Sequence, residues 1–456
     1  MMDTLTAAAA VHGRALGPPA TFTRVVTDSR ALDAGDLFVA LKGERFDGHD
    51  FVTQALAQGA AAALVDAQRA ASFDGALIAV DDTLAALGAL AAHWRRRFDL
   101  PVVAITGSNG KTTTKEMVAS IFRAAAGADA VAATAGNLNN AIGLPLTVLG
   151  LRPRHRLAVF ELGMNHRGET RELAAIAAPT IALVTNAQRE HQEFMRSVAE
   201  VADEHADAIA ALPPDGSAII NADDAHAPVW RAAARAAGAR VSTFGVDADA
   251  DVTATFVLHA GGSELVLHTA QGDATVTLGV PGRHMIGNAL AAAAAAGAAG
   301  IALHAIAAGL TAFRPVQGRL VPRRGTQGGV VIDDTYNANP DSVRAAIDVL
   351  AAAPGERWLA LGDMGEVGDA GPQFHREIGA YARAAGIARL YAAGPLSREA
   401  AAAFGEAAVH FESVEALAQA LGALARSDVT VLVKGSRFMR MERVVAALTG
   451  TGVGAH

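Results

Sequence analysis

The residues of this chain with the clearest chemical potential form a glycine-rich segment, TGSNGKTT, at positions 106–113. The segment follows a short β-branched run, residues 102–106, and leads into a helical pattern whose apolar residues share one face. A turn between a strand and a helix N-terminus attracts anions, because backbone N–H groups converge there and the helix dipole adds positive potential. The segment therefore predicts a phosphate site, with an ordinary strand-to-helix turn as the alternative. The apolar face of the helix is formed by Met117, Val118, Ile121 and Phe122.

Each residue type in this loop has a task that phosphate chemistry requires. Gly107 and Gly110 permit the tight backbone. Lys111 supplies a cation to the β- and γ-phosphates, and the Thr112 hydroxyl can bind Mg²⁺. The usual phosphate loop has a further glycine five residues before Gly110, where this chain has Ile105. We expect ATP to contact the whole loop, which comprises Thr106, Gly107, Ser108, Asn109, Gly110, Lys111, Thr112 and Thr113.

Polar residues also follow two other apolar runs. Glu161 ends the run in LAVFELG, and Asn186 and His191 follow the run in ALVTN. The carboxyl ends of strands in a parallel α/β sheet present ligand-binding groups. We therefore predict that Thr112, Glu161 and His191 bind magnesium. The alternatives are a glutamate that caps a helix and a histidine with a structural role.

Length and composition describe the protein that must position these residues. The chain has 456 residues, of which 51% are hydrophobic and 18% charged, so it predicts a globular protein of about two to four domains. The net charge of −8, with both signs interspersed, argues against a broad nucleic-acid-binding face. The chain has no cysteine, which excludes disulfides and thiolate chemistry and is compatible with the cytosol.

Apolar, β-branched runs alternate with alanine-rich helical patterns after residue 100. This alternation predicts an α/β fold with parallel sheets covered on both faces. Between Val252 and Val280 apolar and polar residues alternate instead, which predicts antiparallel hairpins attached to the α/β core. The predicted parallel strands are Val102–Thr106, Leu157–Leu162, Ile181–Asn186, Ala218–Asn221, Val330–Asp333, Trp358–Gly362, Arg389–Ala393 and Val431–Lys434.

Two breaks divide the chain. Residues 95–101, RRRFDLP, are charged and end in proline, and residues 313–318, FRPVQG, precede a new series of strands. We therefore predict a small N-terminal α/β domain (1–98), a central parallel-sheet domain (99–314) and a C-terminal Rossmann-like domain (315–456).

Two segments bear on membrane insertion. The apolar segment Ala289–Leu310 is mostly alanine and glycine and contains His304, so it predicts one packed helix of a soluble protein. The N-terminus has no basic residues before its alanine run, and we expect no signal peptide.

Several further motifs, in order along the chain, resemble the Mur ligase family, the ATP-dependent amide-forming enzymes of peptidoglycan synthesis. The loop TGSNGKTT is similar to the ATP loop of that family, which shares its departure from the usual pattern. The resemblance extends into all three predicted domains. The other motifs are TDSR (27–30), GDLFVALKGERFDGHDF (35–51), GNLNNAIGLPLT (136–147), ELGMNHRGE (161–169), PGRHMIGNALAA (281–292), GRL (318–320), DDTYNANPDS (333–342), LGDMGEVG (361–368) and VKGSR (433–437).

The resemblance implies an activity. The segment DDTYNANP is similar to the branch that joins D-alanyl-D-alanine to UDP-N-acetylmuramoyl-tripeptide with ATP and Mg²⁺, through an acyl phosphate. This ligase reaction belongs to cell wall biogenesis and so to cell shape and division. The resemblance further implies a cytoplasmic, monomeric enzyme with small-molecule substrates, no nucleic-acid partner and no membrane insertion.

The resemblance also implies roles for individual residues. Lys111, Glu161, His191 and Arg319 would be catalytic, with Arg319 reaching the nucleotide when the domains close. Beyond the loop, Asn288 would contact adenine and Asp334 the ribose, alongside Arg319.

The implied substrate residues fall into three groups. Each of the five in the C-terminal domain has a structural role, such as a turn or cap residue, as an equal alternative. The residues for the UDP end are Asp28, Ser29 and Arg30; those facing the muramoyl group are Asn137, Asn139 and Asn140; those of the peptide pocket are Tyr336, Asn337, Asn339, Ser436 and Arg437.

One position departs from the family pattern. Family members commonly carry a carbamylated lysine in the helix after the metal histidine, and His205 stands there in this chain. No lysine lies between Lys115 and Lys434, so no shifted alignment supplies one within the central domain. We expect no carbamate. One alternative is that His205, Glu204 or Asp207 replaces the carbamate. Another is that Glu161, His191 and substrate oxygens hold the second metal. A third is that His205, Glu204 and Asp207 are exposed polar residues on an alanine-rich helix.

Two other functions are alternatives to this ligase. One is another branch of the superfamily, such as a folylpolyglutamate synthase or a different Mur ligase, against which TDSR and LKGERFDGHDF argue. The other is a nucleotide-gated binding protein without chemistry, against which the intact Lys111, Thr112, Glu161 and His191 argue. The sequence leaves open whether the third residue of the acceptor peptide is diaminopimelate or lysine.

Overall fold

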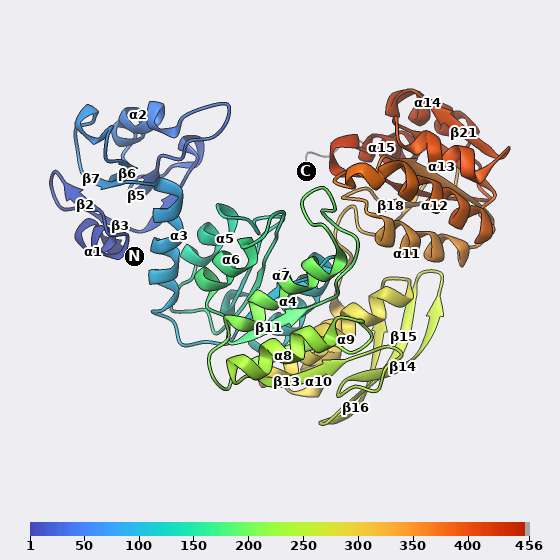
Figure 1. The fold of residues 1–456 in the computed structure, drawn as a ribbon, viewed down its shortest axis with the longest axis horizontal. Coiled ribbons are helices and arrows are strands. Elements are labelled where there is room, and N and C mark those ends of the chain that lie inside the picture. Colours follow the sequence, from blue (N-terminus) through green and yellow to red (C-terminus); the bar gives the residue numbers. More distant parts are fainter. Residues whose placement is uncertain (452–456) are drawn as a thin grey trace.

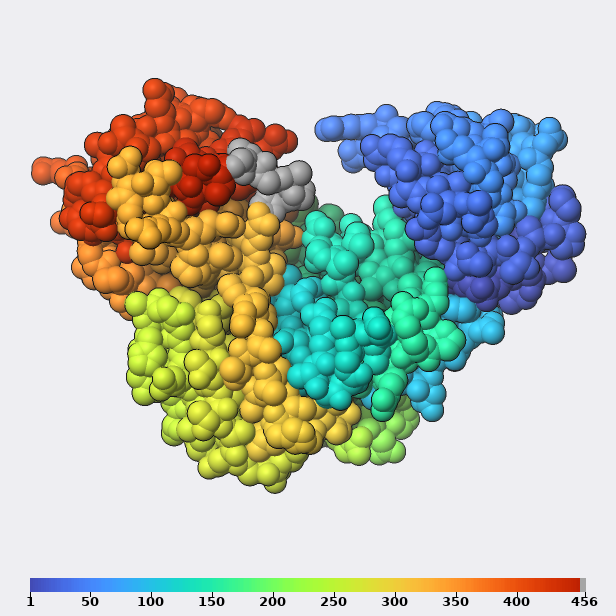
Figure 2. Space-filling model, turned by 180° about the vertical axis from the view of Figure 1, so that it is seen from behind, coloured from blue at the N-terminus to red at the C-terminus, as the bar shows by residue number. Residues whose placement is uncertain are grey.

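The computed structural model describes residues 1–451, in which three α/β parts follow one another along the chain (Figure 1). Their sheets are built from residues 14–80, 102–244 and 321–434. The predicted α/β class is confirmed, because most strand pairs in these sheets are parallel and helices cover the sheets. In Figure 2 the N-terminal part (blue) and the C-terminal part (orange and red) lie apart above the central part, which leaves an open face on the central part between them.

The N-terminal part is a five-stranded sheet with a short β1–β3 ladder beside it. Its elements are β1 (Met2–Asp3), α1 (Thr4–Ala10), β2 (Arg14–Leu16), β3 (Thr21–Phe22), β4 (Arg24–Val26), β5 (Asp36–Val39), α2 (Val52–Ala57), β6 (Ala62–Asp66), β7 (Leu77–Val80) and α3 (Thr83–Arg95). The order is β2-β7-β6-β5-β4, with β2 antiparallel to β7. Helix α3 joins this part to the next, since Trp94 Nε1 donates to the Leu151 carbonyl at 3.1 Å and Arg95 Nε to that of Ala177 at 2.9 Å.

The central part is a six-stranded parallel sheet with a small antiparallel sheet attached. Its elements are β8 (Val102–Thr106), α4 (Lys111–Ala126), β9 (Val131–Ala133), α5 (Gly143–Leu149), β10 (Leu157–Glu161), α6 (Glu169–Ala177), β11 (Ile181–Val184), α7 (Val198–Ala210), β12 (Ser217–Asn221), α8 (Ala227–Ala237), β13 (Arg240–Phe244), β14 (Thr253–His259), β15 (Gly262–Thr269), β16 (Gly272–Leu278), α9 (Arg283–Ala298) and α10 (Leu303–Ala312). The parallel order is β13-β12-β11-β8-β10-β9. The strands that follow β8 are added first on one side of it (β9, β10) and then on the other (β11 to β13). Open α/β sheets bind ligands at such a switch point.

Strand β8 shows why these residues form a buried central strand. Val103 and Ile105 belong to the core that includes α4, α9 and α10, whereas Val102 and Ala104 belong to the core on the other face. All four are fully buried. A strand buried on both faces needs a continuous apolar run, which the sequence shows.

The C-terminal part is a second six-stranded sheet covered by helices. Its elements are β17 (Val321–Arg324), β18 (Val330–Asp334), α11 (Pro340–Ala351), β19 (Glu356–Gly362), α12 (Gly371–Ala384), β20 (Arg389–Ala393), α13 (Ser397–Phe404), β21 (Ala408–Phe411), α14 (Val414–Leu424), β22 (Val429–Lys434) and α15 (Glu442–Thr449). The order is β17-β18-β22-β19-β20-β21, and every pair except β17–β18 is parallel.

The predicted strands are present, with shifted ends. Strand β11 ends at Val184 rather than Asn186, because the Thr185 and Asn186 side chains turn away to hydrogen-bond the loop after β8. The hairpins predicted between Val252 and Val280 are confirmed as the antiparallel sheet β14-β15-β16. No individual strand was predicted before residue 100, where β1–β7 lie. After residue 100 the sequence analysis missed β9, β13, β17 and β21, which are the edge strands of the two six-stranded sheets.

The prediction of a single helix over Ala289–Leu310 is wrong. Helix α9 ends at Ala298 and α10 begins at Leu303, with Gly300 between them at a φ of 80°, a conformation that glycine adopts without strain. Within residues 1–451 no helix is long and apolar enough to cross a membrane.

Two helical glycines give a matched test of packing against α4. A Cβ on Gly309 in α10 would lie 2.3 Å from Ile121 Cα, whereas a Cβ on Gly297 in α9 would meet nothing within 4 Å. We expect Gly309→Ala to lower the free energy of unfolding by about 1–3 kcal/mol, because backbone cannot move aside cheaply. Gly297→Ala should leave it unchanged or raise it by up to about 1 kcal/mol. Urea unfolding followed by circular dichroism measures both, and equal effects would contradict the packing described.

Candidate active site

A cavity of about 1130 Å³ lies at the carboxyl ends of the central strands and is closed on one side by the C-terminal domain. Most of the predicted site residues line it. They are Ser108, Asn109, Gly110, Lys111, Thr112, Thr113, Asn137, Asn139, Asn140, Glu161, His191, Asn288, Arg319, Asp334, Tyr336, Asn337 and Asn339. The structure thus brings together residues more than 200 positions apart.

The loop between β8 and α4 has the backbone of an anion site. Gly107 has a φ of 128° and Gly110 a φ of 85°, both in the range that glycine alone adopts easily. A Cβ on Gly107 would lie 2.0 Å from Thr185 Oγ1, and one on Gly110 would lie 2.4 Å from Asn288 Oδ1. The loop therefore needs glycine for space as well as for conformation. Helix α4 begins at Lys111, so its N-terminus faces the cavity.

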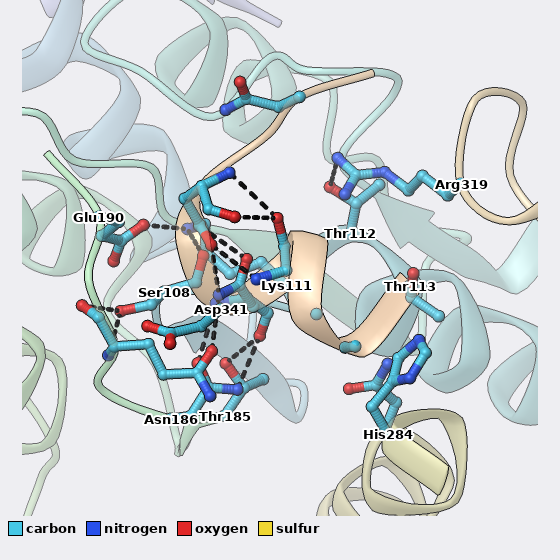
Figure 3. A pocket seen from close by; sticks show the side chains of 18 of the residues that line it. Ser108, Lys111, Thr112, Thr113, Thr185, Asn186, Glu190, His284, Arg319 and Asp341 are labelled. Carbon is cyan, nitrogen blue, oxygen red and sulfur yellow. Dashed lines mark hydrogen bonds and ion pairs between the residues drawn. The ribbon is translucent and has the colours of Figure 1, made fainter. Parts of the chain in front are cut away.

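The segment after β11 holds this loop in position. Asn186 Oδ1 accepts from the Asn109 amide at 2.9 Å, and its Nδ2 donates to the Asn109 carbonyl at 3.0 Å. Thr185 Oγ1 donates to the same carbonyl at 2.8 Å. Gln188 N donates to Ser108 Oγ at 2.8 Å. In Figure 3 Thr185 and Asn186 lie side by side below the labelled loop residue Ser108.

Two cations reach the loop from different sides. Lys111 Nζ donates to the Gly107 carbonyl and lies 3.4 Å from Glu190 Oε2. Arg319 comes from the C-terminal domain and donates to Thr112 Oγ1 at 2.8 Å, with its guanidinium 4.2 Å from the centre of the Tyr336 ring. In Figure 3 Arg319 and Glu190 lie on opposite sides of the loop. The cavity therefore has positive groups on both flanks of an anion site.

Glu161 has the environment of a cation ligand. Its side chain is buried, Oε1 accepts from Asn139 Nδ2 at 2.8 Å, and Oε2 has no hydrogen-bond partner within the described part of the chain. A buried carboxylate oxygen without a partner is costly unless a ligand satisfies it. Mg²⁺ prefers carboxylate oxygen and keeps water and phosphate as its other ligands, so the donor set fits this ion. Over residues 1–451, no three acidic or histidine side chains converge into a complete metal site.

Glu190 is a site residue that the sequence analysis missed. Its side chain is buried beside Lys111, and its Oε1 lies 3.2 Å from Nε2 of the fully buried His205. Burial alone would raise the pKa of the Glu190 carboxyl, but the charge of Lys111 and the hydrogen bond from His205 lower it to about 2. Glu190 lies in a loop, where apolar periodicity gives no signal. The one sequence feature that could have indicated a site residue is that Glu190 directly precedes His191 just beyond a strand end.

The three candidates for replacing a carbamylated lysine have separate places. Glu204 accepts from the amides of Gly168 and Thr170, both at 2.8 Å, and so caps α6. Asp207 pairs with Arg171 at 3.0 Å on the surface. His205 bonds Thr106 Oγ1 at 3.0 Å and Glu190.

The alternative that these three are exposed polar residues is therefore wrong, since two are buried and Asp207 is only partly exposed. Glu204 is 5% exposed and His205 is 0% exposed. Neither side chain lines the cavity. Instead, His205 holds Glu190, whose carboxylate faces the cavity.

His191 is held by the C-terminal domain. Its Nδ1 lies 2.7 Å from Glu366 Oε2, and its Nε2 lies 3.7 Å from Glu190 Oε2. The hydrogen bond with His191 is the largest of the effects that lower the pKa of the Glu366 carboxyl. His191 and Glu366 have φ values of 50° and 58°, a region that residues other than glycine seldom adopt.

Other contacts fasten the C-terminal domain over the loop. The guanidinium of Arg189 pairs with Asp341 at 2.6 Å and with Glu377 at 2.8 Å. Asn109 and Asn339 hydrogen-bond through their side-chain amides at 2.9 Å. Arg189 was not singled out from the sequence, because its partners lie about 150 and 190 positions away.

Several predicted peptide-pocket residues also have structural roles. Asn339 caps α11 by accepting from the Ser342 amide at 2.8 Å. Ser436 is buried and joins Gly365 N to the Ala338 carbonyl. Arg437 pairs with Glu442 at 3.4 Å outside the cavity.

Two nucleotide residues are similarly engaged. Asp334 accepts from Lys434 Nζ at 2.6 Å and from Leu320 N at 3.2 Å, while it still lines the cavity. Thr106 is fully buried beneath the loop, and neither it nor Gly107 lines the cavity.

The structure does not bring the predicted UDP residues to this cavity. Asp28 and Arg30 lie in the N-terminal domain and pair with each other at 2.8 Å, with Arg30 largely exposed. Ser29 begins the short turn between them. These residues lie on the domain that borders the open face in Figure 2.

Comparison with known proteins gives consistent results. Three family models match: "Mur ligase family, catalytic domain" over residues 21–95, "Mur ligase middle domain" over 105–296, and "Mur ligase, glutamate ligase domain" over 318–437. The chain is 43% identical to the UDP-N-acetylmuramoyl-tripeptide–D-alanyl-D-alanine ligase of Escherichia coli (strain K12), over 97% of both chains. It is 36% identical to the ligase of that name from Bacillus subtilis (strain 168), over 93% of this chain and 92% of the other.

Solved structures agree with these relatives. The crystal structure of MurF from Acinetobacter baumannii has a TM-score of 0.91 at 35% identity, covering 98% of both chains. MurF ligase from Thermotoga maritima in complex with ADP has a TM-score of 0.81 at 27% identity, covering 93% of this chain and 96% of the other. A folylpolyglutamate synthase from Mycobacterium tuberculosis, 20% identical with a TM-score of 0.65 over 80% of this chain and 93% of the other, shares the fold. By sequence and by structure, then, this chain belongs to the Mur ligase family.

Proposed function

We propose that the chain is an ATP-dependent ligase that joins D-alanyl-D-alanine to UDP-N-acetylmuramoyl-tripeptide and so makes the UDP-muramoyl pentapeptide of peptidoglycan synthesis. The observation that carries the proposal is that the phosphate loop meets Arg319 and the DDTYNANP segment of the C-terminal domain in one cavity. The relatives that bear this name match the chain over almost its whole length.

The chemistry follows from the energetics of amide formation. A free carboxylate must be activated before an amine can displace an oxygen from it. The tripeptide carboxylate attacks the γ-phosphorus of ATP and ADP leaves, which gives an acyl phosphate. The amine of D-alanyl-D-alanine then adds to the acyl carbon, and the tetrahedral intermediate loses phosphate and a proton.

The protein's task is to bring anions together and stabilise the transferring phosphoryl group. Lys111 and Arg319 flank the loop and would offset the repulsion between triphosphate and carboxylate. Mg²⁺ would add positive charge next to the phosphates, held by Glu161, His191 and Thr112. Thr106 and Gly107 would support the loop from beneath, while residues 108–113, Asn288 and Asp334 would contact the nucleotide.

The substrate residues are proposed by group. Asp28, Ser29 and Arg30 would meet the UDP end across the open face, with Arg30 released from Asp28 to contact a phosphate. Asn137, Asn139 and Asn140 line the cavity on the side of Glu161 and suit the muramoyl group. The proposed peptide pocket comprises Tyr336, Asn337 and Asn339, which line the cavity, together with Ser436 and Arg437, which do not line it. The boundaries at 98 and 314, the monomeric state and the cytoplasmic location stay predictions.

The proposed reaction is tested with UDP-N-acetylmuramoyl-tripeptide, D-alanyl-D-alanine and MgATP. We expect phosphate release that requires both substrates and a pentapeptide product by mass spectrometry. A chain that hydrolyses ATP without either substrate, or that elongates a folate with glutamate instead, would contradict the proposal. A binding protein without chemistry would retain ATP and release no phosphate.

Lys111 offers a direct test of the loop. Lys111→Ala should lower kcat by about 10³-fold or more, because it removes a cation that stabilises the transferring phosphoryl group. Arg123→Ala is the matched control, since Arg123 is a half-exposed cation on the same helix and does not line the cavity. Steady-state phosphate release measures both, and similar losses would show that the effect is structural.

The absence of a lysine in residues 116–433 predicts how the enzyme responds to bicarbonate. Removal of bicarbonate and dissolved carbon dioxide should leave turnover unchanged, because this range has no lysine that could form a carbamate. The measurement is turnover in degassed buffer under argon against the same buffer with added bicarbonate. Activity that falls in degassed buffer and returns with bicarbonate would sink this prediction.

A further inference from the structure

Glu190 is a buried charge to which the proposed chemistry assigns no role. Its carboxylate is 6% exposed, lines the cavity, and has Oε2 3.4 Å from Lys111 Nζ. Removal of a carboxylate from water costs several kcal/mol unless cations or hydrogen bonds compensate. Glu190 is therefore placed at this point against a sizeable desolvation cost, in direct reach of the residue that meets the phosphates.

The second neighbour of Glu190 Oε2 is a histidine nitrogen. His191 Nε2 lies 3.7 Å from it. Two ligands that each stand about 2.1 Å from one magnesium ion lie about 3.0 Å apart at right angles and about 4.2 Å apart on opposite sides of it. The observed 3.7 Å is about 0.7 Å longer than the right-angle separation, so a side-chain shift of that size lets one ion bridge the two atoms.

Each of the two atoms has a partner that fixes its orientation. Glu366 Oε2 lies 2.7 Å from His191 Nδ1 and holds the ring with its Nε2 on the side of Glu190. His205 Nε2 lies 3.2 Å from Glu190 Oε1 and leaves Oε2 for the cavity. Such outer partners are the usual supports of metal ligands.

The charge balance during nucleotide binding points the same way. Lys111 now neutralises Glu190, and the bound nucleotide would compete for the same ammonium group. Once Lys111 turns toward a phosphate, Glu190 would stay buried and ionised with its nearest full cation withdrawn. A divalent cation that arrives with the nucleotide restores the balance and is attracted by both anions.

We propose that Glu190 Oε2 and His191 Nε2 together bind one divalent cation of the nucleotide complex, and that His205 and Glu366 are positioning residues for these two ligands. The remaining ligands are water and phosphate oxygen, as is usual for Mg²⁺. This inference deepens the proposed function, on which it rests for the identity of the nucleotide. It adds a carboxylate to the expected metal set and makes the C-terminal domain, through Glu366, part of the metal site.

The test is Mn²⁺ binding by the full-length protein saturated with a non-hydrolysable ATP analogue, with free Mn²⁺ followed by electron paramagnetic resonance. Glu190→Gln should weaken Mn²⁺ binding by at least about 10–100-fold, and His205→Gln should weaken it by about tenfold. Glu193→Gln, an exposed glutamate of the same loop, is the matched control and should bind as the wild type does. Wild-type affinity in Glu190→Gln would overturn the proposal.

A second measurement separates a metal ligand from a support of the loop. In EDTA, Glu190→Gln should bind the ATP analogue as tightly as the wild type or more tightly, because a negative charge near the phosphates is gone. If Glu190→Gln instead weakens analogue binding in EDTA as much as it weakens Mn²⁺ binding, then Glu190 acts through Lys111 and the proposal is overturned. Failure of the proposed function is distinct, since the wild type would then make no pentapeptide whatever its Mn²⁺ affinity.

Wild-type crystals decide the matter if Glu190→Gln does not fold. Crystals grown with MnCl₂ and the ATP analogue should show an anomalous peak within about 2.5 Å of both Glu190 Oε2 and His191 Nε2. Peaks that contact Glu161 but neither of these two atoms would overturn the assignment.

Discussion

The close approach of the phosphate loop to the segment after β11 is the constraint on which this structure depends. Gly107 leaves no room for a side chain against Thr185, and the side chains of Thr185 and Asn186 hold both polar groups of the Asn109 backbone. The strand β11 stops two residues early to make these contacts. A loop that must bind phosphate through its backbone cannot satisfy its own N–H groups, so its shape has to come from neighbouring elements.

The same segment then connects the loop to everything else at the site. Residues 188–191 reach, in succession, the loop, the C-terminal domain, the loop lysine and the C-terminal domain again. Arg319 and Asn339 add contacts from the other direction. One short segment therefore holds both the loop and the C-terminal domain in position. Such docking also keeps water from an acyl phosphate, which the proposed chemistry requires.

The Glu190–His205 pair bears on the one departure from the family pattern. A carbamylated lysine presents a carboxylate at the end of a helix side chain, and this chain has His205 at that position. His205 faces away from solvent toward Thr106 and Glu190, and Glu190 from the neighbouring loop presents a carboxylate to the cavity. A carboxylate from a genetically encoded side chain needs no bicarbonate. On this proposal two positions 15 residues apart together replace one modified residue.

The sequence by itself determined the α/β class, the buried central strands, the glycine-rich loop and the polar residues at the carboxyl ends of β10 and β11 that line the cavity. These features leave local signals, because a strand buried on both faces is apolar throughout and a tight anion-binding turn needs glycine. Among the strands after residue 100, those that the sequence analysis missed, β9, β13, β17 and β21, lie at sheet edges, where one side is open and the apolar run is short or broken. Tertiary structure alone decided that Glu190 meets Lys111 and His205, that Arg189 meets Asp341 and Glu377, and that Ala289–Leu310 divides into two helices. The reason is physical: the worth of a charge depends on what surrounds it after folding, and those neighbours come from distant parts of the chain that no local pattern connects.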